Sequence, residues 1–91
     1  MPEAQDQRIR RTVLALLAQR APEHSICPSE VARALEQDPM RWRALMPAVR
    51  RIAAALAEEG RIQVTQRAHP VQIEQVSGPV RLHRGSGFDR S

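Results

Sequence analysis

The hydrophobic pattern of the chain changes its period at Gly60. Before this glycine, apolar residues recur every three to four positions, which is typical of amphipathic helices. After it, Ile62 and Val64 alternate with polar residues such as Gln63, which is typical of a half-buried strand. A chain of 91 residues is one small domain. The pattern therefore predicts an α+β fold with helices first and strands after them.

Prolines and capping residues divide the first part of the chain into helices. The first helix is expected from Gln7 to Arg20, and Pro22 prevents its continuation. A second helix is expected from about Ser29 to Glu36. A short helical piece is expected over Met40–Leu45, with Asp38 as its N-cap and Pro39 at its first position. Because proline interrupts a helix, the main third helix is expected over Pro47–Glu59.

Short runs in which apolar and polar residues alternate predict the strands. They are expected at His24–Ile26, at Ile62–Thr65, around Val71 and Ile73, and at Val80–Leu82. The resulting order is helix, short strand, helix, helix, strand, turn, strand. This order predicts a winged helix-turn-helix domain, in which three helices precede a small antiparallel sheet.

The same pattern predicts the domain boundaries and the core. Residues 1–6 are expected to be a flexible N-terminus, residues 7–82 the winged-helix domain, and residues 83–91 a disordered tail. One core is expected from Ile9, Val13, Leu17, Val31, Leu35, Leu45, Val49, Ile52, Leu56, Ile62 and Val64.

Cys27 is the only cysteine, and it stands where the second helix should have its N-cap. A small residue with a weak acceptor fits that place. A thiol at a helix N-terminus is also stabilised as a thiolate, as a redox sensor requires. The structural cap is the preferred interpretation, with the thiol sensor as the alternative. Cys27 with His24, His69 and His83 gives too few clustered ligands for a metal.

No catalytic group, cofactor or metal is expected, so the sequence predicts a protein that is not an enzyme. The chain has no glycine-rich phosphate loop and no lysine for Schiff-base chemistry. No apolar run reaches the length of a membrane span, so no membrane contact is expected. A single cysteine indicates a reducing compartment, and we expect the cytoplasm.

Arginine supplies the net charge of +4, since all 14 basic residues are Arg. A basic domain of this kind favours an anionic partner, and double-stranded DNA is the leading prediction. Arg50 and Arg51 of the third helix are expected at the major groove. Arg43, Arg67 and His69 are expected at the phosphate backbone. Because one domain of this size offers a small footprint, a DNA-binding form is expected to be a homodimer. The alternative is a module that docks a protein partner.

Four sequence blocks carry a resemblance to a known family: "CPSEVARAL", "WRALMPAVR", "GRIQVTQR" and "GPVRL". Together they resemble the signature of a small bacterial family of uncharacterised winged-helix proteins, a domain of unknown function. The resemblance covers Cys27 to about Leu82. It departs in the hairpin, which has "AHPVQIE" where similar sequences usually show a glycine turn and "VDP". The resemblance implies a winged-helix fold and a bacterial cytoplasmic origin, with no known activity or site residues.

Overall fold

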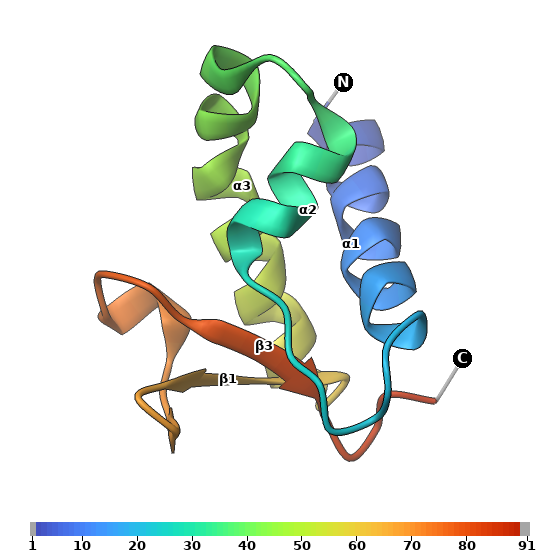
Figure 1. Ribbon diagram of the computed structural model, residues 1–91, viewed down its shortest axis with the longest axis vertical. Helices are drawn as coiled ribbons and strands as arrows, with labels where there is room; N and C mark the ends of the chain where they lie inside the picture. Colours follow the sequence, from blue (N-terminus) through green and yellow to red (C-terminus); the bar gives the residue numbers. More distant parts are fainter. Residues whose placement is uncertain (1, 90–91) are drawn as a thin grey trace.

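A computed structural model describes residues 2–89 as three helices followed by a three-stranded antiparallel sheet (Figure 1). The predicted α+β fold is confirmed. The strand order is β2-β1-β3. The elements are α1 (Pro2–Ala18), α2 (Pro28–Leu35), α3 (Pro39–Glu58), β1 (Ile62–Gln66), β2 (His69–Pro70), the 3-10 helix η1 (Ile73–Gln75) and β3 (Arg81–Arg84).

The helices pack together on one side of the sheet (Figure 1). Between α1 and α2 the chain passes the free edge of β3, where Ile26 pairs with Leu82 as an isolated bridge. Ile26 N–H donates to the Leu82 carbonyl at 2.9 Å, and Leu82 N–H donates to the Ile26 carbonyl at 2.8 Å. The short extended segment expected near Ile26 therefore closes the outer edge of the sheet.

One continuous core joins the helices to the sheet, and most of its predicted members are confirmed as buried. Leu35 lies at its margin and is half-buried. Burying these side chains is the dominant stabilising contribution in a domain of this size. The core also takes in residues that the prediction omitted: Ile26, Ala32, Ala53, Ile73, Val80 and Leu82.

The third helix is continuous, and the predicted break before Pro47 is wrong. Proline removes one main-chain bond, here the bond to the carbonyl of Arg43. Both residues are on the exposed face, where water can solvate that carbonyl. The helix starts where the sequence predicts, since Asp38 is its N-cap and Met40 N–H donates to Asp38 Oδ1 at 2.8 Å.

The second strand is shorter than predicted, because Val71 and Ile73 do not continue it. Strand β2 ends at Pro70, and the chain turns into η1, where Ile73 is buried against α3. Pro70 opposes Thr65 in a pair that exchanges no main-chain hydrogen bonds, so its missing N–H costs nothing there. Because Ile73 is buried against α3, the chain leaves the sheet after Pro70.

The first helix begins earlier than predicted. It starts at Pro2 instead of Gln7, and proline is well accepted in a first helical turn. Asp6 in this additional turn forms an ion pair with Arg51 of α3, with Nη2 2.8 Å from Oδ1. Residues 2–6 therefore belong to the helical layer, and Met1 lies outside the described residues.

The C-terminal part differs from the expected tail. Strand β3 continues to Arg84, and the Gly85 N–H donates to the Arg61 carbonyl at 2.9 Å. Phe88 packs against the core, and its ring lies under the Arg84 guanidinium. The described part of residues 83–91 thus folds back onto the domain, while residues 90–91 lie outside the described part.

The start of α2 explains the unusual cysteine. Cys27 is the N-cap residue in an extended conformation, with φ −89° and ψ 145°. Its N–H donates to the Glu30 carboxylate at 2.8 Å, which is one half of a capping box. Its sulfur accepts from Nη1 of Arg81. The predicted capping position of Cys27 is confirmed.

We expect Cys27→Ser to keep the free energy of unfolding unchanged or to raise it by up to about 1 kcal/mol. Serine is the better cap, and its hydroxyl can still accept from Arg81. Urea denaturation of both forms measures the difference. Cys27→Ala is the control, and it should be less stable than the serine form. A serine variant less stable than the alanine variant contradicts this account.

A half-buried histidine links stability to pH. Nε2 of His83 lies 2.9 Å from Oγ1 of Thr65. Burial, assisted by the charge of Arg81, lowers the pKa of His83 from its usual 6.5. The folded protein therefore favours the neutral ring, and the unfolded chain binds more protons once the pH falls below about 6.5.

We expect the free energy of unfolding to decrease as the pH falls from about 7 to about 5. His83→Gln should flatten this slope, because glutamine does not titrate. Urea denaturation at both pH values measures it. Asp6 and Glu59 change the free energy of unfolding at lower pH only. Their ion pairs lower the pKa of each carboxyl group from its usual 3.8 and 4.5. An equal slope in the variant excludes His83 as the source.

Candidate nucleic-acid interface

The end of α2 and the start of α3 carry a stacked cluster, which we name the arginine corner: Arg33, Trp42 and Arg43. The guanidinium carbon of Arg33 lies 4.6 Å from the centroid of the Trp42 ring, and that of Arg43 lies 5.3 Å from it. Trp42 is half-buried against the core, and both arginines are exposed. The ring thus holds two cationic groups at the surface.

No carboxylate among the described side chains, those of residues 4–89, neutralises either arginine of the corner. The ion pairs among these side chains involve Arg10, Arg20 and Arg51. The two charges of the arginine corner therefore face solvent, where an anion can approach them.

The hairpin between β1 and β2 places a third arginine at the surface. Its two-residue turn consists of Arg67 and Ala68, which we name the hairpin tip, and Gln66 pairs with His69 beneath it. Both turn residues have positive φ, 52° and 69°, and both are exposed with His69. Such turns normally use Asn-Gly, because most side chains disfavour this region. The chain therefore keeps Arg67 at the tip despite backbone strain.

We expect Ala68→Gly to raise the free energy of unfolding by about 1 kcal/mol, since glycine adopts positive φ without a Cβ penalty. Thermal denaturation measures the change. Ala34→Gly is the matched control, because Ala34 is exposed within α2 and the same change should destabilise there. A destabilised Ala68→Gly protein contradicts the strained turn.

Arg50 is not free in solvent, because its guanidinium group is bonded within the protein. Its Nη2 donates to the carbonyl of Ile73 at 3.2 Å and to the carbonyl of Val76 at 3.1 Å. The side chain is half-buried beneath the segment that follows β2. Arg50 therefore fixes η1 on α3, and η1 covers this part of the helix.

Arg51 is exposed but faces α1. Its guanidinium donates to both carboxylate oxygens of Asp6, at 3.1 Å and 2.8 Å. The hydrogen bonds from Arg51 lower the pKa of Asp6 and so keep the partner charged. The charge of Arg51 is thus matched within the protein.

The five predicted site residues are therefore not brought together in one surface. Arg43 lies in the arginine corner, Arg67 lies at the hairpin tip, and His69 lies in the pair beneath it. Arg50 and Arg51 are engaged within the fold. The prediction also missed Arg33. Its contact with Trp42 depends on how α2 packs across α3, and the hydrophobic period of each helix does not indicate that packing.

Metal centres and membrane spans have no counterpart in the described part of the chain. Residues 2–89 contain no group of three or more His, Cys, Asp or Glu side chains that could hold a metal ion. Within the same range, no helix combines the length and the apolar character needed to cross a membrane.

The three helices, the exposed hairpin and the β2-β1-β3 sheet form an α+β arrangement consistent with a winged helix-turn-helix domain. The chain belongs to the family described as protein of unknown function (DUF3253), whose profile matches residues 6–85. A comparison with curated proteins finds no significant match.

Proposed function

We propose that this domain binds double-stranded DNA through the arginine corner and the hairpin tip, as a binding module without a catalytic role. The observation that carries the proposal is the pair of guanidinium groups on Trp42 at the start of the third helix, which no carboxylate among the described side chains neutralises. In helix-turn-helix proteins the start of the third helix and the turn before it face the duplex, and the wing meets the adjacent backbone.

The two contact regions lie toward opposite ends of α3 (Figure 1). The domain measures 31 × 29 × 22 Å, which is close to one turn of duplex, about 34 Å. Arg33 and Arg43 would therefore meet phosphates at one place, with Arg67 and His69 about one groove away. Stacking on Trp42 restricts the arginines before binding and reduces the entropy cost of association.

Contacts to phosphate, with little reading of bases, fit the composition of α3. This helix has no Asn, Gln, Ser or Thr, which are the neutral side chains that commonly contact base edges. Arg50, the best-placed arginine for the groove, is bonded to η1. We therefore propose weak sequence preference and strong salt dependence.

Fluorescence anisotropy with a random-sequence duplex at several salt concentrations tests the proposal. Three or four phosphate contacts should give a slope of about −3 in log K against log salt. A single strand of equal length is the control for duplex preference. If the domain has no duplex affinity even at low salt, DNA binding is excluded and docking of a protein partner becomes the leading function.

A further inference from the structure

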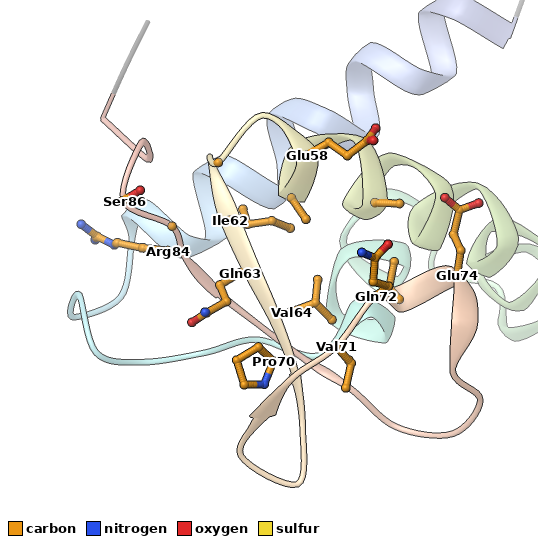
Figure 2. Close-up of a pocket in the computed structure, with 15 residues that line it drawn as sticks. Glu58, Ile62, Gln63, Val64, Pro70, Val71, Gln72, Glu74, Arg84 and Ser86 are labelled. Carbon is orange, nitrogen blue, oxygen red and sulfur yellow. The ribbon is translucent and has the colours of Figure 1, made fainter.

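A groove of about 660 Å³ opens between the end of α3, strand β1 and the segment that leaves β2 (Figure 2). We name it the edge groove. Its volume is typical of sites that hold ligands. It lies at the end of α3 remote from the arginine corner (Figure 1), and Pro70 of its lining directly follows His69 of the hairpin.

Strand β1 directs main-chain groups into the edge groove. In an antiparallel sheet, successive residues bond alternately to the two neighbouring strands. Gly85 N–H donates to the Arg61 carbonyl, so Arg61 faces the β3 side. Ile62 and Val64 therefore face the other side, and the Val64 carbonyl accepts from Val71 N–H at 3.0 Å.

Strand β2 is too short to cover this edge. It pairs with Thr65 and Gln66 only, and the chain then departs toward α3. Among residues 2–89, no hydrogen bond satisfies the N–H and carbonyl of Ile62 or the N–H of Val64 on this side. Two donors and one acceptor are thus left unpaired in the spacing of a strand edge, on two core residues that line the edge groove.

The walls of the groove determine which side chains can enter. Ala54 and Ala57 of α3 are half-buried and small, so they leave space for apolar side chains above them. Glu58 and Glu74 are exposed at the rim (Figure 2). Neither glutamate forms an ion pair within the described residues, so the rim attracts cations.

We propose that the edge groove binds an extended peptide segment with basic side chains, which adds a strand to β1 at Ile62–Val64. Peptide groups match the unpaired N–H and carbonyl groups, as in other cases of strand addition. Alternate side chains would pack over Ala54 and Ala57, and flanking arginines would reach Glu58 and Glu74.

A second copy of the chain fits this edge poorly. Antiparallel pairing of two β1 strands would set Ile62 opposite Val64 of the other copy. Arg61 would then face the other copy's Thr65, which is already paired with β2. The strand β2 of each copy would collide with the turn that follows α3 in the other, so a separate peptide is the fitting occupant.

A titration of the ¹⁵N-labelled domain with acetyl-Arg-Ala-Val-Ala-Arg-amide tests the proposal, because alternation places the central valine and both arginines on one face of the peptide. We expect the amide signals of Ile62 and Val64 to shift and their hydrogen exchange to slow. The peptide with glutamate in place of both arginines should bind about tenfold more weakly. Methylation of the central valine nitrogen removes a main-chain donor, and it should also weaken binding.

Matched variants locate the contact. Glu58→Gln with Glu74→Gln should weaken the arginine peptide about tenfold. Glu23→Gln with Glu36→Gln removes the same charge elsewhere and should leave binding unchanged. Absence of shifts at millimolar peptide, equal binding of the acidic or methylated peptide, or protection of Ile62 caused by self-association without peptide would each overturn the proposal. DNA plays no part in this titration, so its outcome is independent of the proposed function.

Discussion

Arg33→Ala combined with Arg43→Ala is expected to weaken binding to every duplex sequence and to reduce the salt slope by about two units. Each arginine of the arginine corner is exposed, unneutralised and held on Trp42. Each phosphate that the variant no longer neutralises should take about 0.9 from the slope of log K against log salt. Anisotropy titrations of the variant and the wild-type domain at several salt concentrations measure both quantities.

A matched double variant distinguishes the effect of the arginine corner on DNA binding from the effect of a lower net charge. Arg8→Ala with Arg11→Ala removes two exposed arginines from α1 and leaves the arginine corner intact. Its salt slope should stay within the error of the wild-type value. Equal decreases in affinity in both double variants would show attraction by net charge alone, and would contradict a defined contact at the corner.

Leu82→Ala is expected to lower the free energy of unfolding by about 2.7–5 kcal/mol, which is the range for replacing a large buried side chain with alanine. Leu82 is fully buried, and its strand lies between β1 and Ile26. Domains of this size unfold with roughly 5–15 kcal/mol in total, so the variant should lose a large fraction of its stability. Urea denaturation at constant temperature measures the decrease.

Leu16→Ala is the control for Leu82→Ala. Leu16 is half-buried at the margin of the core, so the same truncation leaves a smaller cavity and should cost less. If both variants are destabilised equally, Leu82 does not occupy the centre of the core, and the packing of the sheet against the helices is wrong.

The helices and the first strand were predictable because their signals are local. Asp38 followed by proline marks the start of α3, and the alternation around Val64 marks β1. The second strand was not predictable in the same way. The alternation of Val71 and Ile73 suits a strand, but Ile73 is buried against α3 in a 3-10 helix, and Arg50 holds that helix in place.

The candidate site was predictable only in part, for the same physical reason. Helical spacing correctly turns Arg50 and Arg51 away from the central core, but it does not show what covers that face. Arg50 meets carbonyls 23 and 26 residues later in the chain, and Arg51 meets Asp6, 45 residues earlier. Such contacts depend on tertiary packing. The exposure of Arg67 was predictable, because a two-residue turn protrudes from its hairpin.

The arginine side-chain signals in an NMR titration with a short duplex test the central claim most directly. At low salt, the Nε–Hε signals of Arg33, Arg43 and Arg67 should shift together and saturate at one duplex concentration. The signals of Arg50 and Arg51 should stay in place, since their guanidinium groups are bonded within the protein. Shifts of Arg50 and Arg51 without those of Arg33 and Arg43, or no shifts at all, would contradict DNA binding through the arginine corner and the hairpin tip.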